Sequence, residues 1–101
     1  LMGFTHGDSI RPNNLPSIMA TEERKEWGKT ENHIWFHGHK HHRQLVEMGG
    51  ALVIQLPSLA GHDRYHFKQG YISKAGLCAH IIDKSQGLVG SLYAPVIHKD
   101  K

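Results

Sequence analysis

Closely spaced histidines at the end of an apolar run are the residues of this chain best suited to chemistry. Residues 36–42 read Phe-His-Gly-His-Lys-His-His, and they hold four of the ten histidines. Neutral imidazole is the commonest metal ligand in proteins. Side chains two residues apart on an extended chain point to the same side. The spacing therefore predicts that His39 and His41 face one point as ligands of a metal ion.

Two short apolar runs would have to position these histidines. Residues 32–36, with β-branched and aromatic side chains, predict a strand that ends at the histidine run. Residues 1–5 predict the end of another strand, and His6-Gly7-Asp8 follows it directly. The alternative for that triplet is a simple turn, because Gly-Asp-Ser is good turn chemistry.

One helix is expected, from Ile18 to about Trp27, where good helix formers predominate. Ser17 or Thr21 would cap it and Gly28 would end it. Its apolar face is thin, so we expect it to lie on the surface. Four further strands are predicted from apolar and β-branched runs: Gln44–Met48, Ala51–Leu56, Leu77–Asp83 and Leu88–Val96. A Gly-Gly pair between the first two is a strong hairpin signal.

Length and composition restrict the classes of protein. A chain of 101 residues suits a single domain spanning 1–101, and 39% apolar residues allow only a modest core. Cys78 is the one cysteine, which excludes a disulfide framework and cysteine-based zinc fingers. The formal net charge of +3 does not by itself select nucleic acid. No apolar run suits a membrane span or a secretory signal, so we expect a soluble, cytoplasmic protein.

His6-Gly7-Asp8 and Gly38-His39-Lys40-His41, each at a predicted strand end, resemble the last two metal-binding motifs of the calcineurin-like metallophosphoesterases. More narrowly, the chain is similar to the C-terminal part of phage and bacterial phosphoesterases. The similarity continues to Gly87-Leu88 and covers most of residues 3–93. It implies an α/β fold: the C-terminal half of a metallophosphoesterase β-sandwich, mostly β, with one surface helix.

The resemblance also implies a site and a reaction. His6 and His39 would bind the second of two divalent ions, and His41 would bind the first. Mn, Fe, Zn or Ni would suit such ligands. The ions would acidify a bridging water to hydroxide, which attacks phosphorus. The substrate would be a phosphomonoester, a phosphodiester or nucleic acid.

The chain departs from the family pattern in its missing motifs. The family's Asp-x-His, its Gly-Asp-x-x-Asp with the bridging carboxylate, and its Gly-Asn-His are absent, and residues 7–11 lack the second Asp. Asn32-His33 follows Glu31 and not Gly, and we interpret this pair as a coincidence. The chain therefore resembles a fragment. We expect the full-length parent to hydrolyse phosphoesters and this piece alone to be inactive.

Other polar residues have two interpretations each. In the polar loop after residue 57, Arg64 and His66 are candidates for substrate contact, because a guanidinium offers two hydrogen bonds to phosphate. The alternative is a solvated surface loop. His37 and His42 could contact phosphate, but we expect them to be neighbours of the motif without a role of their own. We expect His80 to be structural, within an apolar strand.

A second class of function is a non-catalytic, histidine-rich metal-binding or assembly module. A fragment lacking half its sheet would expose strand edges, which predicts a homodimer formed through those edges. The parent reading frame separates the two classes. It either does or does not encode the three missing motifs upstream of Leu1.

Overall fold

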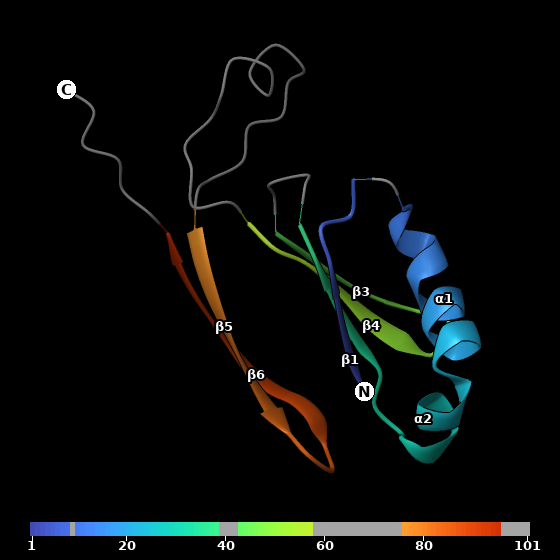
Figure 1. Cartoon of the computed structure of the whole chain (residues 1–101). Coiled ribbons are helices and arrows are strands. Elements are labelled where there is room, and N and C mark those ends of the chain that lie inside the picture. Colours follow the sequence, from blue (N-terminus) through green and yellow to red (C-terminus); the bar gives the residue numbers. More distant parts are fainter. Residues whose placement is uncertain (9, 39–42, 58–75, 96–101) are drawn as a thin grey trace, which may run out of the picture.

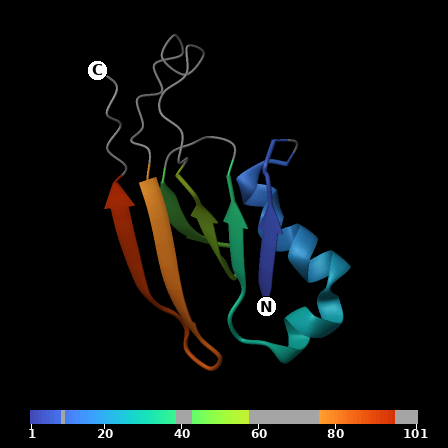
Figure 2. The ribbon, with the colours of Figure 1, turned by 60° about the vertical axis from the view of Figure 1, so that its left-hand side comes forward.

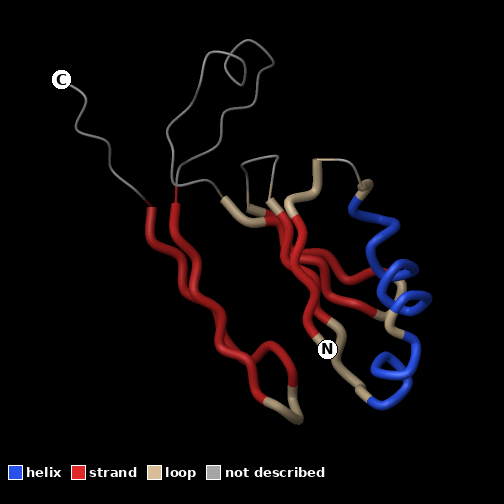
Figure 3. Tube along the Cα trace, in the orientation of Figure 1, coloured by secondary structure: helices blue, strands red, loops and turns tan. Residues whose placement is uncertain are grey.

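Two β-sheets and two short helices make up the described part of the chain. The computed structural model describes residues 1–8, 10–38, 43–57 and 76–95. Helices lie on one side of a four-stranded sheet, and a long hairpin lies on the other side (Figure 1; Figure 3). The strands are β1 (Met2–Thr5), β2 (Ile34–His37), β3 (Gln44–Met48), β4 (Ala51–Gln55), β5 (Gly76–Asp83) and β6 (Gly87–Pro95). The mixed α/β, mostly strand character expected from the sequence is confirmed at this coarse level.

The larger sheet has the order β1-β2-β4-β3. β1 is parallel to β2, β2 is parallel to β4, and β3 is antiparallel to β4. Parallel neighbours need a long crossover, and the segment holding both helices supplies it between β1 and β2. β3 and β4 instead join tightly through Gly49 and Gly50, whose φ angles are +56° and +79°. Such turns favour glycine, and the hairpin predicted from the sequence is confirmed.

The helical segment differs from the single surface helix that the sequence predicted. It forms a 3-10 turn (Pro12–Asn14) and two helices, α1 (Leu15–Glu22) and α2 (Arg24–Lys29). Glu23, with φ −119° and ψ 43°, interrupts the helix. α1 begins three residues early because Pro16 falls in its first turn, where proline is tolerated. No helix in the described ranges is long and apolar enough to cross a membrane.

α1 buries more than a thin surface helix would. Leu15, Pro16 and Met19 are buried, and the Gly49 turn lies against Pro16. On this helix-covered side of the sheet, the Trp35 ring lies over Gly3, where an added Cβ would come within 2.7 Å of it. Glycine at position 3 therefore leaves room for the Trp35 ring.

One part of the core lies between the four-stranded sheet and the β5–β6 hairpin. Ile34, Phe36 and Ile54 form its buried centre. Four partly buried side chains pack against it: Leu52, Leu56, Ile82 and Leu88. Burying a large apolar side chain stabilises a fold by roughly 1.5–3 kcal/mol. This small core is what attaches the hairpin to the sheet.

The tip of the hairpin is built around Asp83. One carboxylate oxygen of Asp83 accepts hydrogen bonds from the Ser85 hydroxyl at 2.8 Å, from the Ser85 amide at 2.9 Å and from the Gln86 amide at 2.9 Å. The Asn32 side-chain amide donates to the Ser85 carbonyl oxygen at 3.1 Å. The tip is therefore tied to the residues that lead into β2.

We predict that Asp83→Ala reduces stability in a pH-dependent way. The hydrogen bond from the Ser85 hydroxyl, with the Gln86 and Ser85 amides, lowers the pKa of Asp83 below its usual 3.8. A lowered folded-state pKa stabilises the fold above pH 3.8, and the contribution is lost as the pH falls through the lowered value. Urea unfolding across pH should show a gap between wild type and variant near neutrality that closes in acid. A gap independent of pH would contradict this account.

Candidate functional site

The carboxyl ends of β1 and β2 meet at one edge of the sheet. The strands are parallel with Thr5 opposite His37, so the residues after each strand emerge side by side (Figure 2). The Gly38 amide donates a hydrogen bond to the His6 carbonyl oxygen at 3.0 Å. The His6 side chain is exposed. The backbone of the first predicted ligand therefore contacts the glycine directly before His39.

Gly7 allows these two chain segments to approach. Its φ of +91° is a conformation that other residues rarely adopt. A Cβ at this position would lie 3.2 Å from the His37 Nδ1 atom and 3.5 Å from the Gly38 carbonyl oxygen. The backbone angle therefore favours glycine after His6, and an added Cβ would also crowd the His37 ring.

His37 is buried at this edge of the sheet, which the sequence did not indicate. Its exposed fraction is 3%, and so is that of Gln55, its register partner on β4. The Leu56 amide donates to the His37 carbonyl oxygen at 2.8 Å. The sequence prediction of a neighbour without a role missed this burial. The burial follows from the position of β2 between β1 and β4, because an interior strand of a parallel sheet is covered on both faces.

The remaining predicted site residues lie outside the described residues. His39, His41 and His42 fall in 39–42, and Arg64 and His66 fall in 58–75. Across the part of the chain that the structure describes, no group of three or more His, Cys, Asp or Glu residues could hold a metal ion. Of the three proposed ligands, the structure places His6 alone.

A pocket of about 310 Å³ adjoins the same end of the sheet. It lies between the β3–β4 pair and the hairpin, and Gln55 lines it together with Cys78 and His80. At its rim, the Arg43 guanidinium carbon lies 3.7 Å from the centroid of the Tyr93 ring. This cation–π contact holds a positive charge beside the edge.

His80 has the structural place expected from the sequence. Its Nδ1 atom lies 2.8 Å from the Ser91 hydroxyl, and its ring centroid lies 5.4 Å from that of Phe36. Cys78, on the same inward face of β5, is a free thiol and partly buried. Both side chains belong to the packing between the hairpin and the sheet.

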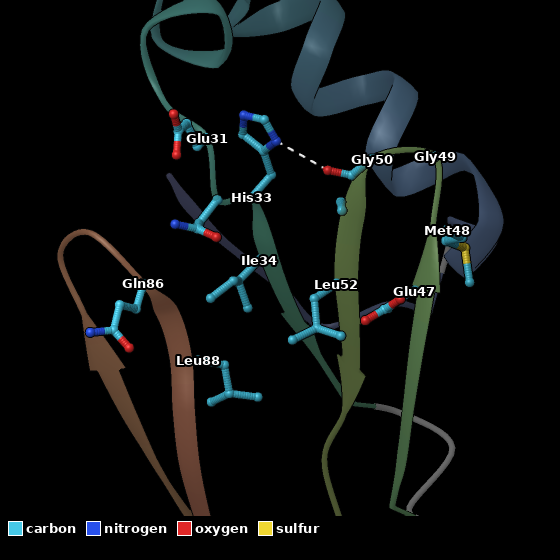
Figure 4. A pocket seen from close by; sticks show the side chains of 12 residues that line it. Glu31, His33, Ile34, Glu47, Met48, Gly49, Gly50, Leu52, Gln86 and Leu88 are labelled. Atoms are coloured by element: carbon cyan, nitrogen blue, oxygen red, sulfur yellow. Dashed lines mark hydrogen bonds between the residues drawn. The ribbon is translucent and has the colours of Figure 1, made fainter.

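His33 lies at the other end of β2, away from His6 and Gly38. Its ring stacks on Trp27 with centroids 3.7 Å apart. Its Nε2 and Nδ1 atoms each lie 3.1 Å from a carbonyl oxygen, of Trp27 and Gly50 respectively, and Figure 4 draws the second contact. His33 therefore joins α2 to the β3–β4 turn. Both residues of the Asn32-His33 pair make structural contacts, Asn32 with the tip of the hairpin and His33 with α2 and the β3–β4 turn.

Comparison of the chain with protein-family models, with curated proteins and with solved structures found no match.

We predict that Gly7→Ala destabilises the chain by about 1–3 kcal/mol, because it adds strain at a positive φ and crowds His37. Gly28→Ala is the matched control. Gly28 lies inside α2 with nothing within 4 Å of an added Cβ, so alanine should stabilise the helix by up to about 1 kcal/mol. Chemical denaturation of both variants measures the difference. Equal effects at the two positions would show that the edge does not require glycine.

Proposed function

We propose that this chain is the C-terminal part of a divalent-metal-dependent phosphoesterase. The observation that carries the proposal is the contact between the two histidine-bearing strand ends. His6 and the glycine that opens Gly-His-x-His are joined by a backbone hydrogen bond at the carboxyl edge of parallel strands. In open α/β sheets, ligands bind outside the carboxyl ends of the strands.

The residues of this chain fit part of a two-metal site. Imidazoles are suitable ligands for Mn, Fe, Zn and Ni, and His6, His39 and His41 would supply three of them. His6 and His39 would hold one ion and His41 the other. The ions would acidify water and neutralise charge on the phosphoryl oxygens. The segment after β1 approaches the end of β2 closely, since a Cβ at Gly7 would lie 3.2 Å from the His37 Nδ1 atom.

The free edge of β1 supports the view that more of the site comes from elsewhere. Within the described residues, β1 pairs with β2 alone. Met2 and Phe4 on this strand are 49% and 71% exposed, although the Phe4 ring stacks on the core residue Phe36 at 5.2 Å. A further strand along this edge would cover Phe4, and one running parallel would end beside His6. A bridging carboxylate could enter there.

The first test is calorimetric titration of the chain with Mn²⁺ and with Zn²⁺. We expect wild type to bind metal and His39→Ala/His41→Ala to lose that binding. His42→Ala is the matched control, since it removes an adjacent histidine outside the Gly-His-x-His pattern, and it should bind as wild type does. Binding that persists in the double variant, or that is lost equally in the control, would contradict the assignment of His39 and His41.

A second test measures turnover. The 101-residue chain alone should not hydrolyse p-nitrophenyl phosphate or its bis-ester above the rate with metal alone, because it lacks a bridging carboxylate. The full-length parent should do so, and it should lose activity on His39→Ala substitution. Activity of the isolated chain would show that this piece is not a partial site. An inactive parent that binds metal would favour the non-catalytic module.

A further inference from the structure

The outer edge of β3 carries a row of side chains with self-complementary charge. β3 is an edge strand, and in the described part of the chain it pairs with β4 alone. Arg43, directly before the strand, and Leu45 and Glu47 within it alternate along the chain. Alternate residues of an extended chain share a face. The row therefore reads cation, apolar residue, anion.

These three side chains lie at the outer edge of the sheet on the side of the hairpin. Arg43 contacts the Tyr93 ring, and Arg43 and Leu45 line the pocket of about 310 Å³ between the β3–β4 pair and the hairpin. Leu45 and Glu47 are in register with Ile54 and Leu52, whose side chains face the hairpin core. Leu45 is 50% exposed, and Arg43 and Glu47 are exposed. A pocket of about 520 Å³ opens beside Glu47, with Leu88 on its opposite wall (Figure 4). Within the described residues, no strand pairs with the outer edge of β3.

Two copies of this edge complement each other when they run antiparallel. A two-fold axis through Leu45 places Leu45 opposite Leu45 of the second copy. The same register places Arg43 opposite Glu47 of the other copy, and this happens twice because the axis is two-fold. Within one chain these two charges are four residues apart, roughly 13 Å along a strand, too far for an ion pair. Opposite charges directly across an antiparallel pair are favourable.

We propose that the chain forms a two-fold dimer by antiparallel pairing of β3 with β3 of a second copy, centred on Leu45. Each copy's sheet then continues into the other's through the edge hydrogen bonds. The Arg43 guanidinium can keep its face on the Tyr93 ring while its N–H groups meet Glu47 of the partner copy. Leu45 loses its exposure at the centre of the interface.

Charge reversal tests the register. Arg43→Glu and Glu47→Arg each place like charges opposite each other twice. Each should raise the dimer dissociation constant by at least about tenfold. The double variant Arg43→Glu/Glu47→Arg restores both opposite-charge pairs and should recover dimerisation. So should an equimolar mixture of the two single variants, now as a heterodimer. Sedimentation velocity over a concentration series measures all five samples.

Matched controls separate the interface from net charge and from folding. Lys25→Glu and Glu22→Arg make the same changes of charge on exposed helical positions, and they should dimerise as wild type does. Arg43→Glu also removes the Tyr93 contact, so its folding is checked by circular dichroism. Recovery in the mixture of single variants shows that both still fold. A monomeric wild type, or single variants that are rescued neither by mixing nor by the double reversal, would overturn the proposal.

Discussion

The parallel, in-register pairing of β1 with β2 is the constraint on which the candidate site depends. It sets Phe4 beside Phe36 on the core face, and Thr5 beside His37 at the end of the strands. A slip of one residue would turn the apolar side chains of β1 to the other face, and it would separate His6 from Gly38. The same register is therefore needed both to pack Phe4 beside Phe36 and to bring His6 to Gly38. The strand that supplies little burial of its own still fixes where the first histidine lies.

Local signals were enough to find most of the strands. Apolar and β-branched runs marked them, and a glycine pair with positive φ marked the turn between β3 and β4. The helical segment was harder, because its start and its interruption depend on tertiary contacts. Met19 of α1 is buried in the fold, and α2 is held in place by the stacking of Trp27 on His33. Neither contact follows from helix propensity, which is a weak guide where packing decides.

For the candidate site, too, local sequence signals indicated some features and tertiary contacts decided the others. The sequence indicated that histidines follow two strand ends, and the structure brings the backbone of these ends together at His6 and Gly38. It did not indicate that His37 would be buried between its neighbours, because that depends on which strands flank β2. Strand order also decides that His33 joins α2 to the β3–β4 turn, at the end of β2 away from the histidine edge. The contacts of His33 could not be predicted from its residue type, because they depend on which elements the topology brings to that end of β2.

The two free edges of the larger sheet differ in the chemistry that they offer. β1 exposes apolar side chains without charge, so its surface does not select a partner by electrostatics. β3 carries opposite charges on either side of Leu45, and isolated edge charges usually discourage pairing. The equal spacing of Arg43 and Glu47 on either side of Leu45 changes this. An antiparallel second copy places each cation opposite an anion, so the charges favour the pairing. Dimerisation through β3 would leave β1 at the outer ends of the combined sheet, free for further polypeptide. The antiparallel arrangement would also point the two histidine edges in opposite directions, so that each site is completed without residues from the other copy.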